Sequence, residues 1–282
     1  ANFAWNVDYN DILQPIGLLA AERVEVVERG PVRAAVRFEY SFGQGSRLVQ
    51  DVRIHADIER IDFAAWCDWH EQDLLLKAAF PVEVFAPEAT FEIQFGAIAR
   101  PTHRNTSWDL ARFEVPAQRW IDLSEAGYGV SLLNDCKYGH DIRGNVMRVS
   151  LLRGPLRSRE ATYADQGEHR FTYALLPHAG DWRGSTIAHA AQLNQPIHAR
   201  LASAKTPANK RLPAQFTFVH SDSPSFVVAA VKKAEDDGRI VVRGYESFGG
   251  RGNVTLKFGL PVRSAWRSRA DERADLDRKS VV

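Results

Sequence analysis

The widest range of chemically active side chains in this sequence lies in one short stretch, Asn134-Asp135-Cys136-Lys137-Tyr138-Gly139. The stretch interrupts a pattern typical of β-strands, and it combines an amide, a carboxylate, a cation and an aromatic ring. Side chains of these kinds hydrogen-bond to sugars and stack on them. A β-turn, in which the Asn and Asp side chains bond to their own backbone, explains the same residues. The sequence therefore predicts either a turn or a carbohydrate contact through Asn134, Asp135, Lys137 and Tyr138.

Two other stretches combine carboxylates with an imidazole, and either could serve acid/base catalysis only if its side chains converged. Asp165-Gln166-Gly167-Glu168-His169 is explained more simply by a turn before a strand whose polar groups point outward. In Asp68-Trp69-His70-Glu71, neighbouring side chains of a strand would face opposite ways, so they cannot meet unless the strand bulges. We therefore expect structural roles for both stretches.

His55-Ala56-Asp57 places an imidazole and a carboxylate on one face of a strand, and both groups can bind zinc. No cluster of Cys or His residues nearby would complete the coordination, so a strand end at the surface is expected. Cys67 and Cys136 have no reactive signature and are expected to be unpaired thiols. Trp66 and Trp69 are expected to pack in the core or against another domain.

The composition excludes several classes of function. Lys and Arg number 36 against 35 Asp and Glu, so no strongly basic field would attract nucleic acid. No apolar run approaches the roughly 18–20 residues of a membrane span, and Ala1–Trp5 lacks the features of a signal peptide. Two cysteines cannot form a disulfide framework, so a cytoplasmic location is expected. Because the first residue is not Met, the chain is interpreted as a segment of a longer protein.

Apolar and polar residues alternate along almost the whole chain with the period of two that β-strands require. The run at 32–40 is a clear case, since it follows the turn Arg29-Gly30-Pro31. The best candidate for a helix is 185–194, which the pattern describes equally well as a strand. Further strands are expected at 24–28, 48–55, 60–69, 74–84, 90–95, 129–133, 146–151, 170–176, 215–219, 226–232, 239–245 and 254–258.

Many strands without intervening helices predict an all-β fold of antiparallel sheets stacked face to face. The segment 203–213 is polar, contains two prolines and breaks the periodicity, so it is expected to be a linker. It would separate a large β-sandwich domain at 1–202 from a small β domain at 214–282. The charged segment Arg267–Lys279 is expected to be frayed or disordered.

Several sequence blocks follow one another in an order that short motifs would not produce by chance. They lie at 28–34, 68–71, 76–81, 100–109, 111–115, 132–141, 143–146, 150–155 and 165–169. Together they cover most of residues 1–200 and resemble the C-terminal region of the α-mannosidases of glycoside hydrolase family 38, closest to the cytoplasmic and vacuolar type. The resemblance implies a large antiparallel super-sandwich of the galactose-mutarotase-like kind, followed by a smaller β-sandwich.

The resemblance implies that the whole enzyme is a retaining glycosidase that uses zinc and hydrolyses terminal α-D-mannosyl residues of oligosaccharides such as N-glycans. Its nucleophile and zinc ligands would lie in an N-terminal catalytic barrel of the same polypeptide, before Ala1. No catalytic residue, metal ligand or cofactor is therefore assigned to this chain, which alone should be inactive, and zinc is expected in the full-length enzyme. The expected partners are that barrel and a mannose-containing oligosaccharide.

By the same resemblance, loops of the sandwich would form part of the rim of the active site. Arg153 follows a predicted strand, and its guanidinium could bind a carboxylate of another domain in bidentate fashion or form a salt bridge at the strand end. Arg104 and Asn105 lie in the loop 101–107. The expected rim residues are Asn134, Asp135, Lys137, Tyr138, Arg153, Arg104 and Asn105.

Two other classes of function stay open at this stage. The chain could be a free-standing carbohydrate-binding module, or an independent enzyme of the aldose epimerase kind with its own His and Glu facing a concave sheet. In addition, 267–282 lacks the strands that members of the family usually have after the segment matching 262–266. A sheet edge left exposed there would favour self-association into a homo-oligomer.

Overall fold

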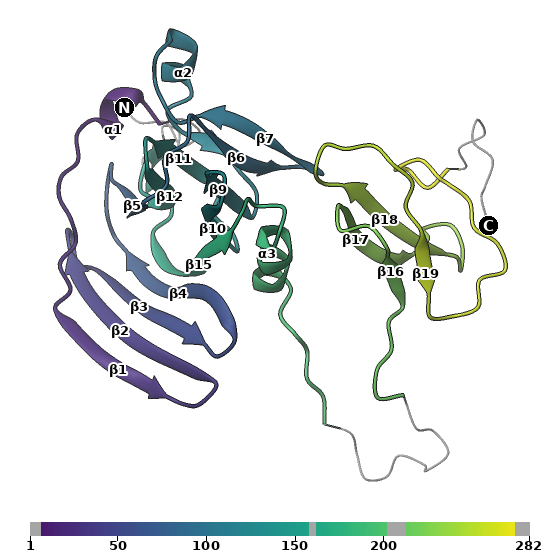
Figure 1. Ribbon diagram of the computed structural model, residues 1–282. Helices are drawn as coiled ribbons and strands as arrows, with labels where there is room; N and C mark the ends of the chain where they lie inside the picture. The colour runs from purple at the N-terminus through teal and green to yellow at the C-terminus, as the bar shows by residue number, and fades with distance from the viewer. Residues whose placement is uncertain (1–6, 158–161, 202–212, 274–282) are drawn as a thin grey trace. The chain divides into compact units, whose positions relative to one another are not determined.

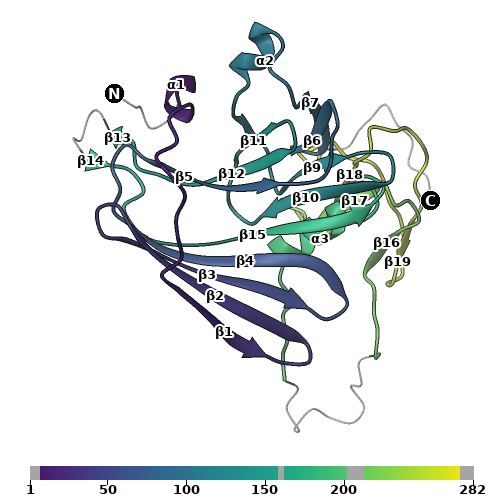
Figure 2. The same ribbon diagram turned by 60° about the vertical axis from the view of Figure 1, so that its left-hand side comes forward.

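The computed structural model describes residues 7–157, 162–201 and 213–273, and β-strands dominate it (Figures 1 and 2). The described residues form two compact units. The first holds the residues up to Ile197 apart from 95–97, and the second holds those from His198 onward together with Phe95–Ala97. The predicted all-β, antiparallel fold is confirmed. The predicted linker at 203–213 lies outside the described residues except for Pro213.

A nine-stranded sheet, called the large sheet below, organises the first unit. Its strand order is β1-β2-β3-β4-β15-β10-β9-β6-β7. Neighbours such as β4 and β15, which are distant in sequence, pair in antiparallel fashion. The strands are β1 (Arg23–Arg29), β2 (Arg33–Phe42), β3 (Ser46–His55), β4 (Ile58–Trp69), β6 (Glu88–Ile93), β7 (Gly96–Pro101), β9 (Trp120–Ser124), β10 (Tyr128–Asn134) and β15 (Gly167–Ala179).

A four-stranded sheet, called the small sheet, packs against one face of the large sheet (Figure 2). Phe63 of the large sheet and Phe80 of the small sheet have ring centroids 5.3 Å apart. Tyr173 stacks on Phe63 at 5.0 Å. Burial of this apolar surface between two layers is the main stabilising contribution expected of such a fold. The strands of the small sheet, in order, are β5 (Leu75–Pro81), β12 (Val146–Arg153), β11 (Gly139–Arg143) and β8 (Val115–Pro116).

The pairing register assigns each residue of the large sheet to one of two faces, because paired residues point to the same side. The inner face packs against the small sheet, and the outer face is the opposite one. Phe63 belongs to the core between the sheets, so the row of residues paired with it lies on the inner face. That inner row is Val26, Val36, Val52 and Phe63, and the adjacent outer row is Glu25, Arg37, Asp51 and Ala64.

Within the described ranges, three short helices accompany the sheets: α1 (Tyr9–Ile12), α2 (Ser107–Ala111) and α3 (Thr186–Asn194). The segment that the sequence described equally well as a strand is thus the helix α3. It packs on β9 and β10. As a result β9 is buried on both sides, with the Trp120 ring stacked on Trp182 at 5.0 Å. A two-stranded pair, β13 (Leu156–Arg157) and β14 (Thr162–Tyr163), completes the first unit.

The second unit contains two antiparallel pairs, β16 (Val219–Ser221) with β19 (Leu256–Phe258) and β17 (Phe226–Lys233) with β18 (Ile240–Glu246). The strand expected at 215–219 begins only at Val219. The expected disorder is wrong for residues 267–273. Glu272 forms an ion pair with Lys232 at 2.8 Å and accepts the backbone N–H of Glu235 at 2.9 Å, which ties this segment down. Residues 274–282 lie outside the described part.

Candidate functional site

Asn134, the last residue of β10, uses its side chain to shape the turn that follows. The residue is only 1% exposed. Its Nδ2 donates to the carbonyl of Gln118 at 3.0 Å, and its Oδ1 accepts the backbone N–H of Lys137 at 2.7 Å. Its own carbonyl accepts a hydrogen bond from Asn194 of α3 at 3.0 Å. These contacts make Asn134 a positioning residue for the 134–138 loop, as the turn interpretation requires.

Asp135 attaches the same loop to β15. Its backbone N–H donates to the carbonyl of Thr172 at 3.0 Å, and its Oδ2 accepts the backbone N–H of Thr172 at 2.9 Å. These two bonds extend the pairing of β10 with β15 by one residue beyond the strand. Asp135 also lines a cavity of about 350 Å³, called the outer-face pocket below.

Lys137 points to the other side of the large sheet. Its Nζ lies 4.4 Å from the centroid of the Phe171 ring, a cation–π contact with a residue of the inner core. Burial lowers the pKa of Lys137, and the nearby groups of Cys136 and Asp165 oppose that change. Tyr138 is 57% exposed, which leaves its ring open to a ligand or a neighbouring domain. The loop therefore divides its polar groups between two faces.

Arg104 stabilises the segment that follows α2. Its guanidinium donates to the carbonyls of Arg112 at 3.1 Å and Phe113 at 3.0 Å. Burial lowers the pKa of Arg104. Asn105 is exposed next to it. Thr102, two residues earlier, accepts the backbone N–H of Gly144 at 2.8 Å, so this loop lies against the turn between β11 and β12.

Arg153 is half-buried at the end of β12, where it pairs with Leu75 of β5. Since β11 starts at Gly139 and runs antiparallel to β12, Arg153 lies at the end of the small sheet where the 134–138 loop enters. The turn at Gly144 marks the opposite end. The predicted rim residues thus fall into two groups, the 134–138 loop with Arg153 and, separately, Arg104 with Asn105.

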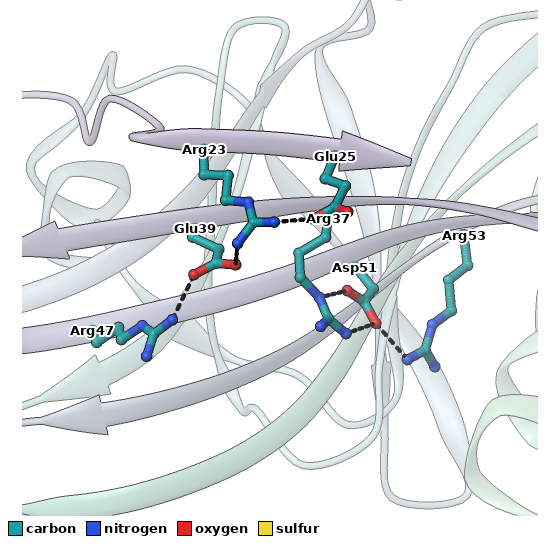
Figure 3. Close-up of polar contacts among 7 residues, drawn as sticks. All are labelled: Arg23, Glu25, Arg37, Glu39, Arg47, Asp51 and Arg53. Carbon is teal, nitrogen blue, oxygen red and sulfur yellow. Dashed lines mark hydrogen bonds and ion pairs between the residues drawn. The ribbon is translucent and has the colours of Figure 1, made fainter. Parts of the chain in front are cut away.

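The outer face of β1–β3 carries a network of ion pairs that the sequence analysis missed (Figure 3). Arg37 binds both oxygens of Asp51, at 2.7 Å and 3.1 Å, and Arg53 adds a bond to the same carboxylate at 3.0 Å. The hydrogen bond from Arg37 lowers the pKa of Asp51, with a smaller contribution from Arg53, while desolvation opposes both. Together with a second, separate group of ion pairs on the same face, these residues are called the charged ladder; its members are Arg37, Asp51 and Arg53 in the first group and Arg23, Glu25, Glu39 and Arg47 in the second.

The outer-face pocket lies beside the charged ladder, between β2 and the 134–138 loop. Trp66 was expected to pack in the core or against another domain, and it does not lie in the core. It is half-buried on the outer face, where its Nε1 donates to Glu168 at 3.1 Å. Trp69 is 1% exposed and belongs to the core, as expected. The pocket is lined by Arg37, Val49, Asp51, Arg53, Ala64, Ala65, Trp66, Asp135, Arg170, Phe171 and Thr172.

A second polar group, buried beneath α3, also escaped the sequence analysis. Nε2 of His178 lies 2.7 Å from Asp122 Oδ2, and Ser131 Oγ donates to the same oxygen at 2.7 Å. Thr186 of α3 lies 2.7 Å from Ser131. Burial opposes protonation, but the bond and charge of Asp122 outweigh it and raise the pKa of His178. His178 is only 5% exposed, so this group holds α3 on the sheet and is closed to a substrate.

The stretches set aside in the sequence take structural roles. Glu71 is 1% exposed and accepts hydrogen bonds from Gln44 N at 2.8 Å and Ser46 Oγ at 2.7 Å. His70 pairs with Asp68 at 3.0 Å at the surface. Asp165 occupies a turn with φ +58°, and its carbonyl lies 2.7 Å from Nε2 of His169. The imidazoles and carboxylates therefore serve separate local contacts.

No group of three or more His, Cys, Asp or Glu side chains within the described ranges could hold a metal ion. His55 ends β3, and Asp57 follows in the turn to β4 with φ +58°. Cys67 is buried and Cys136 exposed, and both are free thiols. Burial raises the pKa of Cys67 to about 12, which keeps it protonated. In the part of the chain that the structure covers, no helix is long and apolar enough to cross a membrane.

Comparison with protein families gives two matches. The family model described as "Glycosyl hydrolases family 38 C-terminal domain" matches residues 2–161. The model described as "Glycosyl hydrolases family 38 C-terminal beta sandwich domain" matches residues 225–281. Among the described residues, the first match lies in the first structural unit apart from 95–97, and the second match lies in the second unit.

Individual proteins agree with these matches. The chain is 41% identical to human Alpha-mannosidase 2C1 over 96% of its own length and 26% of that protein. It is 39% identical to Alpha-mannosidase G of Dictyostelium discoideum over 88% of its length and 23% of that protein. The chain thus spans about a quarter of the length of these relatives.

Among solved structures, an alpha-mannosidase from Enterococcus faecalis V583 superposes with a TM-score of 0.74. The sequence identity is 16%, and the match covers 87% of this chain and 32% of that one. This likeness establishes the fold. The predicted large antiparallel β-sandwich, followed by a β-sandwich domain, is thereby confirmed.

Proposed function

The chain belongs to glycosyl hydrolase family 38, and we propose that it is the C-terminal β-sandwich region of an α-mannosidase. The whole enzyme would hydrolyse terminal α-D-mannosyl residues of oligosaccharides such as N-glycans. The main support is that both family models match in sequence order, and that the relatives named above are α-mannosidases about four times as long.

An incompletely covered sheet face supports a docked catalytic region of the same polypeptide. On the inner face of β1 and β3, Val24 is 58% exposed and Ile54 is 54% exposed. Their rows continue across the sheet into the packed core, to Ala65 and, through Ile61, to Leu175 respectively. Exposed apolar side chains gathered on one face of a sheet suit an interaction surface. The catalytic region would cover this surface, called the inner-face patch: Val24, Val26 and Ile54.

The chemistry itself is proposed to lie outside residues 1–282. A retaining glycosidase needs two carboxyl groups about 5–5.5 Å apart at the anomeric carbon. The zinc expected in the full-length enzyme would bind and polarise sugar hydroxyls, and the described residues do not fit it. The aldose epimerase alternative gains no support from His70 and Glu71. The Glu71 carboxylate accepts a hydrogen bond from Ser46, and His70 pairs with Asp68, so the two side chains do not form a catalytic pair.

The rim contribution is proposed mainly for the group at one end of the sandwich. Tyr138 offers an exposed ring, and Arg153 lies at the same end of the small sheet. Asp135 and Lys137 come from the same loop but point to opposite faces of the large sheet. Asn134 and Arg104 would act by positioning, since their side chains bind backbone groups, and Asn105 is exposed beside Arg104.

A cytoplasmic location is proposed on the two free cysteines. Unpaired thiols are ordinary in a reducing compartment and unusual in small secreted domains. A homo-oligomer stays a prediction, and so does the domain boundary at 203–213. Size-exclusion chromatography with light scattering over a range of concentrations measures the oligomeric state.

The test compares the 282-residue chain with the full-length polypeptide, using 4-nitrophenyl α-D-mannoside with added Zn²⁺. We expect turnover by the full-length protein and none by the chain alone. Turnover by the chain, lost on chelation, would overturn the proposal. Docking is tested in the full-length protein with Ile54→Asp, which should lower activity and thermal stability together. Ile240→Asp is the matched control, because Ile240 is a strand residue with a similar exposure of 56% in the second unit.

A further inference from the structure

The outer-face pocket owes its shape to a small residue between larger ones. The register aligns Asp51 of β3, Ala64 of β4 and Thr172 of β15 side by side. Trp66, two residues along β4, points to the same face. The single methyl group of Ala64 leaves space that the neighbouring side chains surround. The resulting volume of about 350 Å³ lies within the roughly 300–1,000 Å³ typical of small-molecule pockets.

One wall of the pocket is aromatic. Trp66 is half-buried, and the hydrogen bond from its Nε1 to Glu168, at 3.1 Å, holds one edge of the indole in place. Arg170 is paired with Trp66 in the register and also lines the pocket. A ring held at one polar edge can offer its apolar face to a ligand with little loss of side-chain entropy. Such a wall suits the CH-bearing face of a pyranose ring.

The remaining walls are polar, and their charges nearly cancel. Three arginines (Arg37, Arg53 and Arg170) face two carboxylates (Asp51 and Asp135). Asp51 takes two of the five N–H donors of Arg37 and one of those of Arg53, so both guanidiniums retain donors. Ion pairs formed in advance also hold these groups in place before a ligand arrives. This balance favours a neutral ligand with many hydroxyl groups over an anion.

We propose that the outer-face pocket binds a neutral saccharide, one or two hexopyranose units long, by stacking on Trp66 and by hydrogen bonds to Arg37, Arg53, Asp51 and Asp135. The inference goes beyond the proposed function, since it assigns sugar binding to side chains of this chain and needs neither zinc nor a nucleophile. The inference is also compatible with the alternative of a free-standing carbohydrate-binding module, because a carbohydrate-binding surface can serve either an enzyme or such a module.

Binding is measured on the 282-residue chain by isothermal titration calorimetry and by saturation-transfer NMR. The probes are methyl α-D-mannopyranoside and an α-linked mannobiose, with glucose 6-phosphate and inorganic phosphate as the anionic arm. A shallow polar pocket of this size is expected to give a Kd on the order of 0.1–10 mM for the neutral sugars. Phosphate binding without sugar binding would overturn the proposal, as would no binding of any sugar at 50 mM.

Two variants remove the pocket in different ways. Ala64→Leu fills the floor without deleting any polar group, and it should weaken sugar binding at least about tenfold. Trp66→Ala removes the stacking wall and should weaken binding about tenfold. The matched control is Trp108→Ala, whose side chain is 76% exposed on α2 and does not line the pocket. Far-UV circular dichroism and thermal melting check that each variant folds.

The variants decide the location of the site. Loss of binding in both folded pocket variants, with wild-type affinity in Trp108→Ala, supports the proposal. Unchanged binding in a folded Ala64→Leu chain overturns it. Should Ala64→Leu fail to fold, Trp66→Ala decides alone, because its ring is only half-buried and its removal leaves the core intact. Activity of the full-length enzyme is not used, so the proposed function stands or falls separately.

Discussion

The two faces of the large sheet show how one set of strands can hold a core and a polar surface together. On the inner face, Leu132 and Phe171 are at most 3% exposed and pack under the small sheet. On the outer face of the same sheet, Asp51 of β3 forms ion pairs with two arginines, Arg37 and Arg53. The faces alternate because side chains of a strand point to opposite sides in turn. Stability should therefore reside mainly on the inner face and ligand contacts mainly on the outer one.

The contrast has two exceptions. The inner face at β1 and β3 is only partly covered, and the outer face at β9 and β10 is closed by α3. A residue's contribution to the free energy of unfolding should depend on whether other elements of the fold cover its side chain, and not on which face of the sheet it occupies. The predictions that follow test this statement.

Leu132→Ala should have the largest effect. Leu132 is fully buried on the inner face, and removing a buried leucine side chain lowers the free energy of unfolding by about 2–5 kcal/mol. Val24→Ala on the same face should cost less than about 1 kcal/mol in the 282-residue chain, because Val24 is 58% exposed. Urea denaturation measures both, and equal losses would contradict the role assigned to covering.

The free energy of unfolding should depend on pH because of His140, which is fully buried between the sheets. Burial lowers its pKa to about 4, although its bond to the Tyr138 carbonyl opposes this. The imidazole of His140 is therefore protonated below about pH 6.5 in the unfolded chain, whereas in the folded chain it stays neutral down to about pH 4. Stability should fall as the pH drops from about 6.5 to 4, by about 3 kcal/mol in total. An NMR titration of the His140 ring with a midpoint near pH 6.5 would contradict this.

Asp122→Asn tests the part of the outer face that α3 covers. It should lower the free energy of unfolding by about 1–2 kcal/mol, because it removes the charge that faces the buried His178. The raised pKa of His178 stabilises the fold below about pH 6.5, and that contribution disappears as the pH rises through the folded pKa. The difference in stability between Asp122→Asn and the wild type should therefore become smaller as the pH rises. Thermal melts at pH 5.5 and 8.5 measure it, and a constant difference would exclude the charge of Asp122 as the cause.

Arg37→Ala should have a small effect on stability, about 0.5–1 kcal/mol, because the ladder is partly open to water. The loss should shrink in 1 M NaCl, where the Debye length falls to about 3 Å. Arg47→Ala, at the more exposed end of the ladder, should cost less. Denaturant titrations at low and high salt provide the comparison, and a salt-independent loss would indicate packing by the Arg37 stem.

Most strands of the first unit could be predicted because one side of each meets the core and the other meets water. The strand β9 escaped prediction for the opposite reason: Trp120–Leu123 are buried on both sides by the small sheet and by the segment carrying α3 and Trp182, so they show no alternation. The β11 strand was also missing from the predicted strands, since Gly139 follows a stretch that interrupts the alternating pattern and His140 and Asp141 are polar residues buried in the fold. Tertiary covering, which sequence does not report, decides both cases.

The functional residues were harder to predict than the fold. The sequence singled out Asn134 by its type, but burial commits its side chain to the backbone. The outer-face pocket depends on which residues face Ala64 across β3 and β15, and that pairing is known only from the register. Alanine gives no chemical signal of its own. A small residue on a polar face, beside an aspartate on the neighbouring strand and two residues before a tryptophan, is the pattern that marks this pocket.

The inner-face patch also bears on how firmly the proposed enzyme must hold its two parts. Three exposed aliphatic side chains form a weak contact by themselves, yet a tether that keeps two surfaces in reach gives an effective concentration in the millimolar range. Parts joined by a peptide bond would stay associated through this small area, whereas the same parts made as separate polypeptides would come apart on dilution. Covalent continuity would thus supply the affinity that the surface lacks.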